Sequence, residues 1–161
     1  MLGLHEATLI AFGALLIWAA VEDFARLSIS NWVSLTIVGI YPVHVLASPV
    51  PVNWPLSGAL AVATFAVGFF LFARNLFGGG DVKLLTATSL WVEPSAFASF
   101  IFLTSIAGGI IGLGFLIFRR RTAPNTGDAP QVAEPAVMPF GMAIAVGGLM
   151  VAVNLLRGIN P

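Results

Sequence analysis

The sequence contains no cysteine, only two histidines and few charged residues. The absence of cysteine excludes disulfides, thiolate zinc sites and cysteine nucleophiles. His5 and His44 are too few and too far apart in the sequence to predict a metal centre, so we expect no cofactor. Seven basic residues are balanced by seven acidic ones. No basic stripe is left to neutralise phosphates, which argues against a nucleic-acid partner.

The shortage of charged residues also indicates what surrounds the protein. Charged residues make up 9% of the chain and hydrophobic residues 58%, with a mean hydropathy of +0.99. In a typical soluble domain, roughly a quarter of the residues are charged. There are too few charged residues here to cover a water-facing surface, and lipid must therefore surround much of the chain. We therefore predict an all-α polytopic membrane protein in which residues 1–161 form one transmembrane domain, with no separate soluble domain.

Apolar segments separated by polar or Gly- and Pro-rich stretches predict about six transmembrane helices. They cover residues 4–21, 31–47, 55–73, 82–92, 95–118 and 137–156. Residues 119–135 have the composition of a flexible aqueous loop. The fourth segment would be only about 16 Å long as a helix, against about 30 Å of hydrocarbon. We expect it to follow a Gly-rich loop at residues 78–80, whose irregular backbone helps to complete the crossing.

The positions of lysine and arginine predict the orientation, because these residues concentrate on the cytoplasmic side. An outside N-terminus places six of the seven basic residues inside: Arg26, Arg74, Lys83, Arg119, Arg120 and Arg121. Only Arg157 is then outside. We therefore expect both termini outside, and Asp23 and Asp81 at the cytoplasmic face of the inner membrane.

Asp23 and Asp81 are the residues best suited to chemistry, because each adjoins an apolar segment and both share a membrane face. Ionisable groups near the membrane core are costly and indicate function. In a pair of carboxylates, one takes a proton from water while the other donates a proton to a peptide carbonyl. Close carboxylates share a proton, since they do not easily both ionise. Helix dipoles favour Asp81, at a helix start, as the base and Asp23, at a helix end, as the acid.

Each candidate also has a purely structural explanation. Asp81 after three glycines is typical of a helix N-cap, and Asp23 is compatible with a solvated turn. Glu22 reads as a solvated interfacial charge and His44 as a packing residue. The residues alone therefore leave three functions open: a peptidase, a small transporter or channel subunit that uses both acids for protons or cations, and a noncatalytic assembly scaffold.

Three sequence elements, in order along the chain, resemble the type IV prepilin peptidase family. GGGDVKLL at residues 78–85 is similar to its GxGD signature. Asp23 followed by ISN at 29–31 is similar to its first aspartate and Ile-x-Asn element, with serine where proline is common. MPFGMAIA at 138–145 resembles a Pro-Tyr-Gly-x-Ala-Ile-Ala stretch, with Phe140 replacing tyrosine.

The resemblance implies an aspartyl endopeptidase with Asp23 and Asp81 as catalytic residues. It assigns supporting positions to Gly78, Gly80, Lys83 and Asn31. The implied reaction removes a short basic leader from membrane-bound prepilin or pseudopilin precursors on the cytoplasmic side. The implied surroundings are the lipid bilayer and the pilus assembly machinery.

Larger members of that family also N-methylate the new N-terminus and carry a cytoplasmic insertion with paired cysteines. Here the first two helices are expected to be joined by only about nine residues, and cysteine is absent. The chain thus resembles the short form associated with tight-adherence (Flp) pili, which implies no methyltransferase activity. Preflagellin processing and presenilin-like intramembrane cleavage are further options within the peptidase class.

Overall fold

The computed structural model describes residues 3–122 and 140–158. These residues form six α-helices and one 3-10 turn, and no strand occurs among them. The elements are α1 (Leu4–Arg26), α2 (Asn31–Ala47), α3 (Trp54–Ala73), α4 (Gly79–Ser89), η1 (Pro94–Ala96), α5 (Phe97–Thr122) and α6 (Phe140–Leu156). The predicted all-α fold is therefore confirmed. Residues 123–135 of the predicted loop, and 137–139 of the last predicted helix, lie outside the described ranges.

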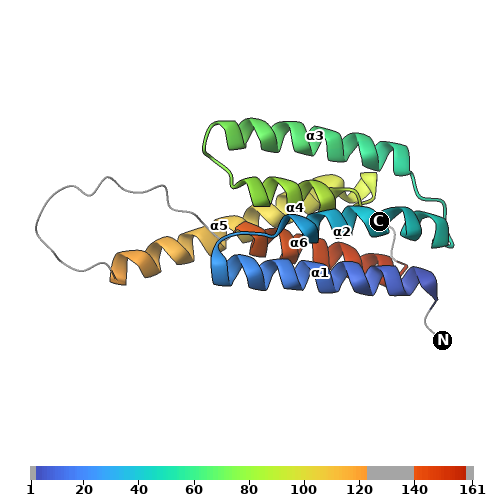
Figure 1. The fold of residues 1–161 in the computed structure, drawn as a ribbon, viewed down its shortest axis with the longest axis horizontal. Helices are drawn as coiled ribbons and strands as arrows, with labels where there is room; N and C mark the ends of the chain where they lie inside the picture. Colours follow the sequence, from blue (N-terminus) through green and yellow to red (C-terminus); the bar gives the residue numbers. More distant parts are fainter. Residues whose placement is uncertain (1–2, 123–139, 159–161) are drawn as a thin grey trace, which may run out of the picture.

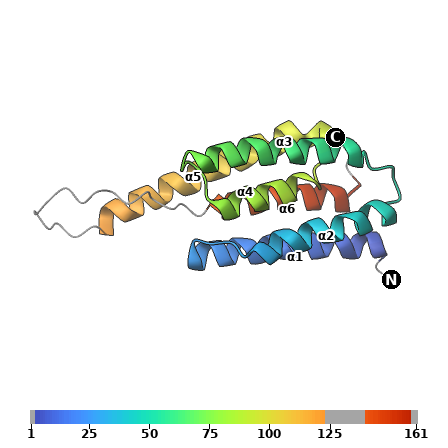
Figure 2. The same ribbon diagram turned by 45° about the horizontal axis from the view of Figure 1, so that its top comes forward.

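The helices form three layers, with α4 and α6 in the middle. Figure 2 shows this pair between α3 and α5 on one side and α1 and α2 on the other. The contacts agree, because α4 packs against α2, α3 and α6, while α6 packs against α1, α4 and α5. Gly148 of α6 permits this close packing, since a Cβ there would lie 2.6 Å from Leu16 Cδ1 and 2.9 Å from Thr88 Cγ2. Residues on α4 and α6 are thus held at the centre of the bundle.

Successive helices run in alternating directions. In Figure 1, α1, α3 and α5 end at the same end of the bundle at which α2, α4 and α6 begin. The last turns of α5 extend beyond the other helices at that end. The alternation brings Arg26, Arg74 and Lys83 to one end, as the basic-residue pattern requires.

The outer surface is apolar, as expected of a chain surrounded by lipid. On α3 alone, Trp54, Val62 and Phe69 are each more than half exposed. Helices α1, α3 and the segment Pro94–Phe118 are long and apolar enough to cross a membrane, and α2 and α6 are shorter apolar helices. Multi-pass membrane insertion follows from these helices.

Helices α1, α4 and α5 have ends that differ from the prediction. Helix α1 continues to Arg26 instead of ending at residue 21, and it ends where Leu27 adopts a left-handed conformation (φ 50°) and donates its N–H to Asp23 O over 2.8 Å. Helix α5 continues to Thr122, so residues 119–122 are helical and not part of a loop. Helix α4 covers Gly79–Ser89 instead of residues 82–92. Hydropathy locates the apolar centre of a helix but misses polar terminal turns that still satisfy backbone hydrogen bonds.

Candidate active site

The structure brings the two predicted aspartates together. Asp23 lies in the last turn of α1, and Asp81 is the third residue of α4. Both side chains are buried, with exposures of 3% and 8%. The charge of Asp23 acts on Asp81, and the backbone N–H of Gly141 is directed at both carboxyl groups. Two acids distant in sequence thus meet at the start of α6.

The amino end of α6 supplies the polar environment of Asp23. The N–H groups of Gly141 and Met142 are directed at its carboxylate. Asp23 Oδ2 is buried and finds no hydrogen-bond partner of good geometry among the residues that the structure describes. The positive end of the α6 dipole therefore opposes the unfavourable field at the end of α1. The assignment of Asp81 as the base and Asp23 as the acid therefore stays a prediction, since both carboxyl groups now lie at the start of a helix.

Glycines permit the close approach of these groups. A Cβ at Gly78 would lie 2.6 Å from Asp81 Oδ2, and one at Gly141 would lie 2.8 Å from Asp23 Oδ2. Ile29 fills the space beside them. A Cβ at Gly80 would lie 3.2 Å from Ile29 Cβ, and a Cβ at Gly141 would lie 2.7 Å from Ile29 Cδ1. The prediction of an irregular Gly-rich loop was wrong for Gly79 and Gly80, which are helical. Gly79 and Gly80 instead allow α4 to pack closely against Phe72 and Ile29.

Two polar contacts fasten the surrounding turns. Lys83 Nζ donates to Asn31 Oδ1 over 2.8 Å and so joins α4 to the first residue of α2. Glu22 Oε2 accepts the N–H of Ser30 over 3.0 Å and so closes the α1–α2 turn. The predicted supporting residues Lys83 and Asn31 are therefore neighbours, and Glu22 is not merely a solvated charge.

Reasoning from the sequence missed Gly141 as the residue between the acids. The signal was present in FGMAIA, where a glycine follows Phe140, but no role was assigned to it. Phe140 itself packs edge-on against Phe77, with ring centroids 4.6 Å apart. Within residues 3–122 and 140–158, no group of three or more His, Asp or Glu side chains is placed to hold a metal ion. The polar groups that the structure brings together here are the two carboxyl groups and the N–H groups of α6.

Comparison with known proteins adds an independent finding. A model of the type IV leader peptidase family matches residues 10–113. The matched region contains Asp23, Asp81 and the glycines before it, whereas the segment at 138–145 lies beyond it. Comparisons with curated proteins and with solved structures each found no match.

Proposed function

Because this chain belongs to the type IV leader peptidase family, as its motifs predicted, we propose that it removes the short basic leader of Flp-like type IV prepilins at the cytoplasmic face of the inner membrane. Family membership indicates a peptidase that acts on leader sequences in a membrane context. The observation that carries the finer proposal is the meeting of Asp23 and Asp81 at the N–H of Gly141.

In the proposed mechanism the two carboxyl groups hold one proton between them. The ionised group takes a proton from a water molecule, which attacks the scissile carbonyl carbon. The protonated group donates to the carbonyl oxygen. When the C–N bond breaks, the amine leaves with the proton that the first group took from water, and a hydroxyl of the intermediate returns a proton to the second group. Burial of both side chains supports proton sharing, because two charges are costly in a site with little water. The pair is best described by its joint titration, since the N–H of Gly141 serves both groups.

The proposed orientation has six crossings with both termini outside, so that the end with Asp23 and Asp81 faces the cytoplasm. Arg26, Arg74 and Lys83 lie at that same end, which supports it. A precursor anchored by its own apolar helix then approaches within the bilayer. Its basic leader stays at the cytoplasmic boundary, beside the two acids.

The proposal assigns the chain to the short form without methyltransferase activity. Only residues 27–30 separate α1 from α2, which leaves no room there for an inserted domain. The chain also has no cysteine to form the pairs of the larger members. The expected product is therefore a mature N-terminus that carries no methyl group.

A processing assay tests the proposal. The purified protein in lipid vesicles is mixed with a Flp-type precursor and S-adenosylmethionine, and the product is identified by mass spectrometry. We expect loss of the leader and an unmodified new N-terminus. A precursor that stays intact would refute leader cleavage, whereas a methylated product would refute only the assignment to the short form.

A further inference from the structure

The link between α1 and α2 places one apolar side chain at the acid end of the bundle. The link consists of residues 27–30. Leu27 and Ser28 are exposed and Ser30 is half-buried, whereas Ile29 is only 8% exposed. The buried side chain of this link is therefore that of Ile29.

Ile29 lies against two helices that carry the active site. Its backbone and Cβ face α4, since a Cβ at Gly80 would lie 3.3 Å from Ile29 N and 3.2 Å from Ile29 Cβ. The tip of its side chain faces α6, since a Cβ at Gly141 would lie 2.7 Å from Ile29 Cδ1. Gly80 directly precedes Asp81, and Gly141 packs against Asp23. Ile29 thus touches the backbone beside each acid.

Hydrogen bonds on both sides of Ile29 hold the link in place. The N–H of Leu27 donates to Asp23 O over 2.8 Å. The N–H of Ser30, directly after Ile29, donates to Glu22 Oε2 over 3.0 Å. The backbone of Ile29 is therefore tied to the last turns of α1, and its side chain has a fixed place from which to contact α4 and α6.

The packing of α4 on α6 explains why the size of this side chain matters. Further along the two helices, a Cβ at Gly148 would lie 2.9 Å from Thr88 Cγ2, so there the helices meet directly. At their starts, Ile29 lies against both. Protein interiors are close-packed and transmit small displacements. The volume at position 29 therefore affects how far apart the starts of α4 and α6 lie.

We propose that Ile29 is a positioning residue for leader cleavage, whose side chain sets the spacing of the Asp23 and Asp81 carboxyl groups while Glu22 holds it in place through the Ser30 N–H. This role rests on the proposed function, because it concerns the same two acids. Ile29 itself touches no reacting atom.

Ile29→Val tests the role with one methyl group. Valine keeps the Cβ that faces α4 and lacks the Cδ1 that faces α6. The kcat of cleavage should fall about tenfold, part of the roughly 100-fold that a shift of about 1 Å costs, with KM unchanged. Ile37→Val is the matched control, since Ile37 in α2 is 0% exposed and loses the same atom. Equal kcat values for the two variants would reduce Ile29 to ordinary packing and overturn the proposal.

A combined variant tests whether Ile29 acts through α6. The Cβ added by Gly141→Ala collides with Ile29 Cδ1, the atom that Ile29→Val removes. The combined variant should therefore cleave about threefold or more faster than the product of the two single effects implies. Purely multiplicative effects would contradict a contact between Ile29 and Gly141 that matters for the rate.

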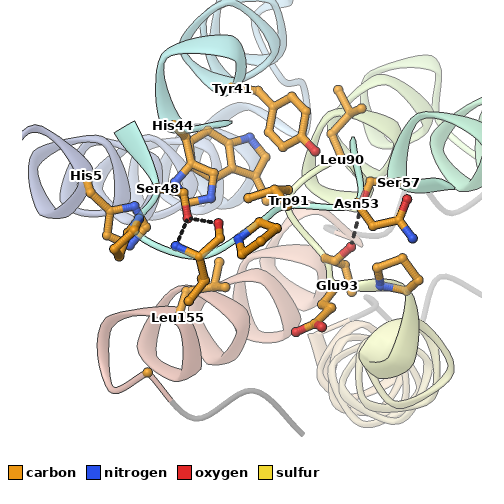
Figure 3. Close-up of a pocket in the computed structure, with 17 residues that line it drawn as sticks. His5, Tyr41, His44, Ser48, Asn53, Ser57, Leu90, Trp91, Glu93 and Leu155 are labelled. Atoms are coloured by element: carbon orange, nitrogen blue, oxygen red, sulfur yellow. Dashed lines mark hydrogen bonds between the residues drawn. The ribbon is translucent and has the colours of Figure 1, made fainter. Parts of the chain in front are cut away.

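The part assigned to Glu22 is tested by removing its hydrogen bond. Glu22→Ala should lower kcat about tenfold, whereas Glu22→Gln, whose amide oxygen still accepts the Ser30 N–H, should cleave like wild type. Ser48→Ala is the matched control, because the Ser48 hydroxyl bonds to the backbone of Val50 in the link from α2 to α3, at the other end of the bundle (Figure 3). Equal kcat values for Glu22→Ala and Ser48→Ala, or a raised KM in Glu22→Gln, would show that Glu22 does not act through Ile29.

Solid-state NMR measures the spacing without relying on peptidase activity. The aspartates of the chain are Asp23, Asp81 and Asp128. With Asp128→Asn as background, labelling of aspartate carboxyl carbons leaves one labelled pair, whose dipolar coupling gives their separation. Ile29→Val should change that separation by about 0.5 Å or more, the tolerance of a catalytic arrangement, and Ile37→Val should not.

The two readouts separate the possible failures. An unchanged carbon–carbon separation in Ile29→Val overturns the proposal, and so does a wild-type pair without measurable coupling. A wild-type protein that leaves the precursor intact refutes the proposed function, whereas the NMR comparison still decides whether Ile29 sets the spacing of the acids.

Discussion

The backbone of Gly141 packs directly against the carboxyl group of Asp23. A Cβ at residue 141 would lie 2.8 Å from Asp23 Oδ2 and 2.7 Å from Ile29 Cδ1. No side chain fits between Gly141 and Asp23. The first N–H groups of α6 can therefore approach the carboxyl group of Asp23 closely. The geometry of the site therefore depends on the absence of a side chain at this position.

Gly141→Ala should slow leader cleavage about 100-fold, because a displacement of the order of 1 Å in a catalytic group has that effect. The added Cβ pushes Asp23 or Ile29 aside. Gly109→Ala is the matched control, since a Cβ at Gly109 meets nothing within 4 Å. Initial rates of precursor processing check the prediction. Equal rates for the two variants would show that α6 does not position Asp23.

Gly78→Ala should impair cleavage by a similar factor, about 100-fold, through the other acid. Its Cβ would lie 2.6 Å from Asp81 Oδ2, so the carboxyl group must rotate away. Gly58→Ala in α3 serves as control, because nothing lies within 4 Å of its Cβ. The variants are compared in the same processing assay after circular dichroism confirms helical content. A Gly78→Ala enzyme with wild-type rate would contradict this role.

The Lys83–Asn31 contact should contribute modestly to the rate of leader cleavage. Lys83→Met and Asn31→Ala should each slow cleavage less than about tenfold, with a coupling of about 0.5–1 kcal/mol, because the contact is exposed. Arg74→Met removes a charge at the same membrane face, where Arg74 covers the Phe70 ring, and serves as control. A double-mutant cycle on processing rates gives the coupling. Complete inactivity of Lys83→Met would mean that Lys83 acts on the substrate itself.

The packing of α4 on α3 makes a prediction about stability. A Cβ at Gly68 would lie 2.9 Å from Val82 Cγ1, so Gly68→Ala should destabilise the fold by about 1–3 kcal/mol through overpacking. Adding Val82→Ala removes the collision. The double variant should then be more stable than the sum of the single effects implies, by more than about 0.5 kcal/mol. Thermal unfolding in detergent measures this, and strict additivity would contradict the contact.

The sequence predicted the helices well because lipid-facing segments are apolar on nearly all sides. It misplaced the start of α4, because glycines normally disfavour helices. Here Gly79 and Gly80 are helical and pack closely, since a Cβ at either position would lie 3.2 Å from Phe72 or Ile29 and would push that neighbour aside. The end of α1 was also missed, since Asp23 and Arg26 look like loop residues although their backbone completes the helix. Tertiary packing thus explains the start of α4, whereas local backbone hydrogen bonds explain the end of α1.

The aspartates were identified from motifs, but their surroundings were not. That Gly141 lies between the acids follows from the packing of α6 against α1 and α4, which no local pattern contains. No local pattern predicts the contact of His5 with His44 either. The two residues are distant in sequence, and their ring centroids lie 4.9 Å apart in the structure. Residue type predicts which groups carry chemistry, whereas helix packing decides which groups meet.

The most direct test of the account compares Asp23→Asn and Asp81→Asn with wild type in precursor processing. Asparagine keeps the size of each side chain but removes its ability to exchange a proton. Each substitution should slow cleavage about 1,000-fold or more, as loss of a general acid or base implies, while thermal unfolding shows an intact fold. If either variant cleaves at the wild-type rate, the two-aspartate mechanism is wrong.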